Sequence, residues 1–220
     1  MARLSLLPKV ALWLVALSAL GVLFLRSAQS AREAPFAVER DGLASWSLVV
    51  APERDPFGAW LALTPPPRLA PPLGRQIFAR AGESVRYPNP ASMPLILRSE
   101  FDVAIAGALE PDVITNLART LGFEAPTFEP RCMARRRVSE PGSTRSVYFL
   151  VFDAPAFAEF RRSVLELLRG VREGVSAFDP AALSPDLMVA ATNETFGQWL
   201  PLRDPTAAFD VDCLAPVEVR

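Results

Sequence analysis

Two short apolar stretches place the strongest constraint on how this chain folds. One runs from Ser184 to Thr192, where a proline turn leads into apolar residues, and the other runs from Met93 to Ser99. Both have the length and residue types of a strand, so alternate side chains of each should line one face of a sheet. Each is followed by a turn and then by further strand, so the chain reads as two similar halves.

A hydrophobic segment precedes this body. Val10 to Leu25 contains only apolar or small residues and has basic residues on both sides. Such a segment targets a chain to a membrane, either as a signal peptide cleaved near residues 28–30 or as an uncleaved transmembrane anchor. We therefore expect residues 1–30 to be one of these two, with membrane contact through residues 4–25. Both alternatives place the body on the non-cytoplasmic side, in a periplasm, a lumen or the extracellular space.

Two cysteines follow the hydrophobic segment, at Cys132 and Cys213. They are too few for a four-ligand zinc site, and in an exported chain they are a candidate disulfide. Two buried free thiols are the alternative. The sequon at Asn193 matters only if the chain passes through a eukaryotic secretory pathway.

The composition excludes several classes of function. The chain has no histidine, which removes the side chain whose pKa lies nearest neutrality and a common metal ligand. Glycine-rich phosphate loops, nucleophile elbows and acidic clusters at metal spacing are also absent from the sequence. Since 23 basic residues balance 24 acidic ones, the overall charge does not favour a nucleic-acid partner. We expect no metal and no cofactor.

Strands and helices alternate along the body. Residues 31–57 read as a tether with a first short strand, and residues 58–220 as one α+β domain. Strands are expected at residues 46–50, 58–64, 95–105 (interrupted near Ser99 and Glu100), 127–138, 147–152, 184–192 and 208–219. Helices are expected at residues 71–81, 111–121 and 155–173, with a short turn at 196–200.

Two helices carry clear apolar stripes. The stripe of the second helix is Val113, Ile114, Leu117 and Leu121. The stripe of the third is Phe157, Phe160, Val164, Leu167, Leu168 and Val171. Residues 147–152 are apolar on both faces, so their strand should be central in its sheet.

This order of elements resembles that of the two-histidine (2H) phosphoesterase superfamily, which includes RNA 2',3'-cyclic phosphodiesterases and 2'-5' RNA ligase-like proteins. The resemblance covers roughly Gly58 to Arg220, with similar local phrases at residues 60–67, 95–101 and 184–189. It implies an α+β fold with two lobes of antiparallel sheet and helices packed outside. Here that fold would follow an N-terminal hydrophobic helix.

The family's catalytic motifs are missing from the matching strands. Each motif is a histidine, any residue, a threonine or serine, and then an apolar residue, and the two strands face each other across a cleft. Here Asp186 and Met188 stand at the histidine and hydroxyl positions of the second motif, and Pro94 and Ile96 at those of the first. The adjacent register of the first motif also lacks both groups. The resemblance therefore implies a degenerate, non-catalytic member.

A basic run is the remaining candidate site. Arg131, Arg135, Arg136 and Arg137 lie in one expected strand, and Arg98 lies elsewhere in the chain. Arginines grouped in this way can bind phosphate groups or acidic lipid headgroups. A solvated strand edge, kept from aggregating by its charge, is the simpler interpretation of the same run.

The sequence thus predicts an exported or membrane-anchored binding domain without catalysis. One alternative is an accessory subunit of a membrane protein complex, held by a retained transmembrane helix. A second alternative is a divergent cyclic phosphodiesterase that uses Asp186 and arginines in place of histidines. Retention of the hydrophobic segment would favour the subunit, and activity dependent on Asp186 would favour the enzyme.

Overall fold

The computed structural model describes residues 13–14, 16–23, 25–26, 34–52, 55, 57–124, 128–140, 143–171, 178–192 and 213–220. The chain divides into two units, Met1–Ala34 and Pro35–Arg220. In the first unit the described residues between Trp13 and Arg26 are helical. Searching the described part of the chain finds no helix that is both long and apolar enough to cross a bilayer. The expected turn at 196–200 and the Asn193 sequon lie outside the described residues.

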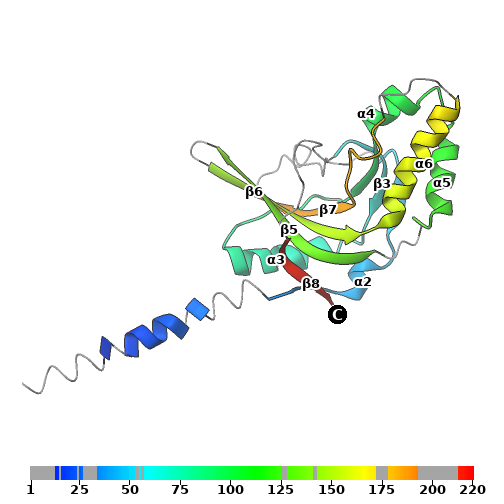
Figure 1. Ribbon diagram of the computed structural model, residues 1–220. Helices are drawn as coiled ribbons and strands as arrows, with labels where there is room; N and C mark the ends of the chain where they lie inside the picture. The colour runs from blue at the N-terminus through cyan, green and yellow to red at the C-terminus, as the bar shows by residue number, and fades with distance from the viewer. Residues whose placement is uncertain are drawn as a thin grey trace, which may run out of the picture. The chain divides into compact units, whose positions relative to one another are not determined.

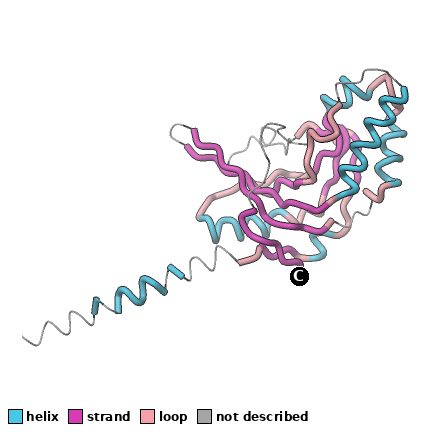
Figure 2. Tube along the Cα trace, viewed as in Figure 1, coloured by secondary structure: helices cyan, strands magenta, loops and turns pink. Residues whose placement is uncertain are grey.

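The second unit has an α+β fold built on two sheets of unequal size (Figure 1). The larger sheet curls (Figure 2). Its strand order is β1-β8-β5-β6-β7. These strands are β1 (Phe36–Val38), β5 (Glu129–Glu140), β6 (Ser143–Asp153), β7 (Asp186–Ala191) and β8 (Cys213–Val219). Of the last expected strand, residues 208–212 lie outside the described residues.

The larger sheet is mixed, whereas purely antiparallel sheets were expected. β1 runs parallel to β8, and the other three pairs are antiparallel. Residues 36–38, which we expected in a polar tether, form β1 because Phe36 and Val38 are buried in the core. The sequence pattern missed this strand because three residues are too few to show an alternation.

The smaller sheet is antiparallel, with the order β2-β3-β4. Its strands are β2 (Ser47–Val50), β3 (Ala59–Thr64) and β4 (Met93–Leu97). β4 and β7, which correspond to the two apolar stretches at residues 93–99 and 184–192, contact each other although they belong to different sheets.

The second unit contains the three expected helices, α3 (Ala70–Ala81), α5 (Pro111–Thr120) and α6 (Pro155–Val171), and a short helix, α2 (Arg40–Leu43), that follows the unexpected strand β1. Proline begins α5 and α6, where a missing amide hydrogen costs nothing. Gly82 ends α3 at a φ of 66°, and its N–H donates to the carbonyl oxygen of Phe78.

The expected strand at residues 95–105 is wrong after Leu97. Arg98–Glu100 forms a short helix, α4, and Phe101–Ile105 forms a π-helix, η1. The carboxylate of Glu100 turns the chain here, because it accepts the backbone N–H of Leu97 at 2.9 Å. The ring of Phe101 then stacks on Trp60 with a centroid distance of 3.9 Å.

The expected apolar stripes are only partly buried. Ile114 is buried on α5, but Val113 is 41% exposed, and Ala118 is buried in its place. On α6, Leu167 and Val171 are exposed, and the charged Arg161 is buried within the stripe. A helix buries a narrow stripe against its neighbour, so an apolar residue one position off that stripe faces outward.

Both faces of the larger sheet are covered. Successive residues of β6 alternate between the main core, which holds Tyr148 and Leu150, and a smaller cluster that holds Val147 and Phe149. This confirms that β6 is an internal strand.

The predicted disulfide between Cys132 and Cys213 is present, with an S–S distance of 2.02 Å, and it joins β5 to β8.

Candidate functional site

The four degenerate motif positions are buried. Pro94 and Ile96 lie in β4, and Ile96 packs in the main core. Met188 packs in the smaller cluster with Phe57 and Phe149. Asp186 is 5% exposed, and its carboxylate accepts a hydrogen bond of 2.7 Å from the Ser184 hydroxyl. Ile96 and Met188 therefore pack in two different apolar clusters.

The structure brings together only two of the five candidate arginines. Arg135 and Arg137 lie on one face of β5, and Arg136 between them lies on the other face. Arg131 lies beside a bulge near the start of β5. Arg98 begins α4, which is well separated from the outer end of the β5–β6 hairpin (Figure 1). A single five-arginine anion site is not formed.

Arg135 and Arg137 meet at Glu83, a residue that the sequence patterns did not single out. Arg137 Nη2 donates to Glu83 Oε1 at 2.9 Å, and Arg135 Nη1 lies 3.9 Å from the same oxygen. Tyr148 Oη donates to Glu83 Oε2 at 2.9 Å. We call Glu83, Arg135, Arg137, Ser146 and Tyr148 the Glu83 cluster.

Strand register explains why this cluster forms. Arg135 pairs with Tyr148 and Arg137 with Ser146 across the β5–β6 hairpin, so all four side chains share one face. Glu83 follows Gly82 at the end of α3. The next residues hold it over that face, because Arg86 exchanges two backbone hydrogen bonds of 2.8 Å with Ala191 of β7.

Glu83 and Tyr148 keep fixed protonation states at neutral pH. Burial raises the pKa of Glu83, but hydrogen bonds from Ser146, Arg137 and Tyr148 outweigh it and leave this pKa below its ordinary value. Burial and the hydrogen bond to Glu83 raise the pKa of Tyr148. Glu83 is thus ionised and Tyr148 protonated, so neither has the pKa near neutrality that acid–base catalysis requires.

Glu83→Gln should lower the free energy of unfolding at neutral pH by about 1 kcal/mol, because one charged partner of two arginines becomes neutral. A lowered folded-state pKa stabilises the fold above the ordinary value of 4.5, and this contribution is lost as pH falls through the folded-state pKa. The variant should therefore show a flatter decline of stability in acid than the natural chain. Urea unfolding at a series of pH values measures this.

Ser84→Ala is the matched control for that experiment, because Ser84 is the exposed neighbour of Glu83 and does not titrate. Its acid decline should equal that of the natural chain. A Glu83→Gln curve parallel to the natural one would contradict the assignment.

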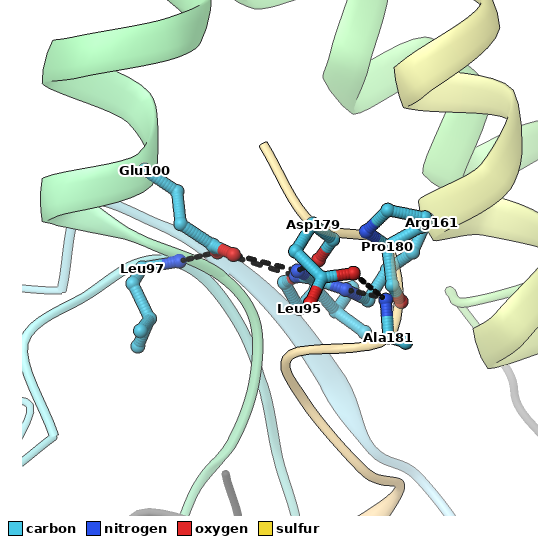
Figure 3. A network of polar contacts seen from close by, with 7 residues as sticks. All are labelled: Leu95, Leu97, Glu100, Arg161, Asp179, Pro180 and Ala181. Atoms are coloured by element: carbon cyan, nitrogen blue, oxygen red, sulfur yellow. Dashed lines mark hydrogen bonds and ion pairs between the residues drawn. The ribbon is translucent and has the colours of Figure 1, made fainter. Parts of the chain in front are cut away.

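A second polar network is centred on a buried arginine and joins α6, α4 and β4 (Figure 3). Arg161 of α6 has a side chain that is 0% exposed, and its Nη2 lies 2.6 Å from Glu100 Oε1. Its remaining bonds go to Glu100 Oε2 and to three carbonyl oxygens, those of Leu95, Asp179 and Pro180. These contacts use all five N–H groups of the guanidinium, so the network holds the fold together and offers no donor to a ligand.

The sequence contained a signal for Arg161 but none for Glu83. Arg161 is four residues after Phe157 and three before Val164, which places it within the apolar stripe of α6. A charge at such a position indicates a buried partner. Glu83 and Arg137 are 54 residues apart, and no local pattern connects them.

Comparisons with protein-family models, with characterised proteins and with solved structures found no match for this chain. Across the part of the chain that the structure describes, no group of three or more histidine, cysteine, aspartate or glutamate side chains could hold a metal ion.

Proposed function

We propose that this chain is an exported, non-catalytic binding domain that its hydrophobic N-terminal segment delivers to a membrane. The observation that carries the proposal is the disulfide between Cys132 and Cys213, which joins two neighbouring strands of the larger sheet. Such bonds form and persist in oxidising compartments outside the cytoplasm. The hydrophobic segment at residues 10–25 agrees with that location, because it is a targeting signal in either its cleaved or its retained form.

Among the residues that the structure describes, the contacts of the candidate catalytic groups support binding rather than catalysis. Asp186 is buried and hydrogen-bonded, and Met188 fills a small apolar cluster. Glu83 is occupied by two arginines and a tyrosine. A general base needs a pKa near the working pH and an open position beside a substrate. The pKa of Glu83 is lowered instead, and Asp186 is buried.

A degenerate 2H phosphoesterase-like fold remains part of the proposal. The contact between β4 and β7 supports it, because the resemblance places the two motif strands opposite each other. The parallel pairing of β1 with β8 is a departure from the antiparallel lobes that it implies. In this proposal the fold has kept its two sheets, while the positions of the catalytic motifs are now occupied by buried residues.

The intact mass of the protein from its native host, purified under non-reducing conditions, tests the proposal. We expect the oxidised mass, without free thiols, either for a chain that begins near residue 31 or for a full-length chain in the membrane fraction. A full-length chain in a fixed ratio with other membrane proteins would instead favour an accessory subunit. A full-length chain with two free thiols in the soluble cytoplasmic fraction would contradict export.

The absence of catalysis has its own test. The purified protein should not hydrolyse 2',3'-cyclic nucleotides above the level of a preparation of Asp186→Asn. Hydrolysis that Asp186→Asn abolishes, in a variant whose thermal unfolding is unchanged, would show a divergent phosphodiesterase and overturn the proposal.

A further inference from the structure

Two arginines of the Glu83 cluster converge on one carboxylate. Nη2 of Arg137 and Nη1 of Arg135 lie 2.9 and 3.9 Å from the same oxygen of Glu83. Both guanidinium groups are charged at all relevant pH values and Glu83 is ionised, so two positive charges face one negative charge. The cluster therefore has an excess of positive charge, which attracts a further anion.

The cluster also has donors to offer. In the part of the chain that the structure describes, the guanidinium of Arg137 makes one hydrogen bond, to Glu83. A guanidinium carries five N–H groups, so most of those of Arg137 are unused. Solvent reaches both arginines, since their side chains are 50% exposed at Arg137 and 23% exposed at Arg135. The Arg161 network differs in this respect, because all of its donors are taken.

Buried groups hold the two arginines in place. Tyr148 is 0% exposed and Ser146 is 1% exposed, and the hydroxyl groups of both hydrogen-bond to Glu83. β5 and β6 pair on both sides of these residues, which fixes the spacing of Arg135 and Arg137 along the strand. A ligand that binds to groups already in position loses little free energy in ordering them. The site thus exists before a ligand binds.

The donors indicate the class of ligand. A planar guanidinium matches the oxygens of a phosphate group, which accept two parallel N–H bonds from one arginine. A phosphate group carries about two negative charges near neutral pH, one more than a carboxylate. It is therefore better suited than a carboxylate to a pair of arginines that already has Glu83 beside it.

We propose that Arg135 and Arg137 bind a phosphate group, either as the free ion or as part of a small ester. The inference rests on the proposed function, because it names a class of ligand for a non-catalytic binding domain. The phosphate oxygens accept hydrogen bonds from the N–H groups that Glu83 leaves unused, and Glu83 keeps its hydrogen bond from Tyr148. A solvated strand edge without a ligand is the interpretation that the experiment has to exclude.

The experiment titrates the purified full-length chain, with its disulfide intact, with inorganic phosphate and separately with p-nitrophenyl phosphate. Ionic strength is kept constant, because added salt screens weak attractions between charges. We expect saturable binding by calorimetry. The nitrogen-15 signals of the Arg135 and Arg137 guanidinium groups should shift in NMR spectra, whereas that of Arg136, on the opposite face of β5, should not. Equal affinities assign the free ion as the ligand, and tighter binding of p-nitrophenyl phosphate assigns an ester.

Variants assign the binding to particular side chains. Arg137→Gln should weaken it about tenfold or more, because charge-assisted hydrogen bonds are lost, and Arg137→Lys should recover part of that loss. Arg136→Gln is the matched control, since it removes the same charge from the other face of the same strand, and it should change the affinity by less than about threefold. Glu83→Gln should strengthen binding about fivefold, because it removes a like charge beside the ligand. Thermal unfolding of each variant confirms that it is folded.

The same titration separates this inference from the proposed function. Binding of p-nitrophenyl phosphate without release of nitrophenol supports both. Binding with a release of nitrophenol that Arg137→Gln abolishes supports the site and overturns the absence of catalysis. No saturable binding, or equal losses in Arg137→Gln and Arg136→Gln, overturns the site and leaves these arginines as charges on a strand edge. That result does not affect the disulfide on which the argument for export rests.

Discussion

Arg161→Met should lower the free energy of unfolding by about 3–5 kcal/mol, because it removes one partner of a buried ion pair and leaves the other uncompensated. The side chain of Glu100 is only 10% exposed, so its charge would remain in the interior. Three carbonyl oxygens would also lose a donor. Since small domains have total stabilities of about 5–15 kcal/mol, we expect a large fall in melting temperature or no folded protein.

Neighbouring and conservative variants separate the network from general damage to α6. Arg162→Met changes the next residue, which is exposed and donates only to the carbonyl oxygen of Ala158, and it should alter stability by less than about 0.5 kcal/mol. Arg161→Lys keeps the charge but not the planar fork, so it should recover only part of the loss. Equal stability of Arg161→Met and Arg162→Met in urea unfolding would contradict the role of Arg161.

A double-mutant cycle measures how far the ion pair itself contributes. Glu100→Gln combined with Arg161→Met should be less destabilising than the sum of the two single changes, because no unpaired charge remains buried. Additive effects would show that the carbonyl contacts of Arg161 dominate over its contact with Glu100.

Reducing the disulfide should have the second largest effect. Cys132 and Cys213 are 81 residues apart, and in the chain-entropy model closing a loop of that length contributes on the order of 4 kcal/mol. The variant Cys132→Ala with Cys213→Ala should unfold at a correspondingly lower urea concentration and should not respond to dithiothreitol. The natural chain should approach the curve of the variant once dithiothreitol is added.

The effect of reducing the disulfide also tests which part of the sheet opens and in which compartment the protein resides. Without the bond, β8 keeps a short backbone pairing with β5, at Cys132, Met133 and Ala134, so the β1–β8 edge of the sheet should open first. Amide hydrogen exchange in β8 should therefore increase more than exchange in β6 when the bond is reduced. Identical unfolding of the oxidised and reduced chains would remove the disulfide as an argument for an oxidising compartment.

Local patterns predicted most elements of the second unit for identifiable reasons. Proline at residues 111 and 155 and glycine at residue 82 mark helix boundaries whatever the tertiary context. Apolar runs at residues 147–152 and 186–191 predicted buried strands, because such runs cannot remain exposed to water. The disulfide followed from the count of cysteines and from the expected export.

The errors occurred where distant residues decide the outcome. The apolar run after Leu97 would suit a strand, but Glu100 pairs with Arg161, 61 residues later, and this contact fixes a helical turn instead. Phe36 and Val38 form a strand only because β8, at the other end of the chain, lies beside them. Three residues carry too little periodicity to reveal that pairing.

For the candidate sites, too, the sequence predicted one part and the tertiary structure decided the other. The sequence by itself determined which chemistry is missing, because a chain without histidine and without intact motifs cannot place those groups in any fold. Only the tertiary structure decided which arginines act together. Strand register puts Arg135 and Arg137 on the face that meets Glu83 and turns Arg136 away, and packing against Gly74 places Tyr87 beside the exposed face of α3. Residue types limit the available chemistry, whereas register and packing determine which of those residues meet.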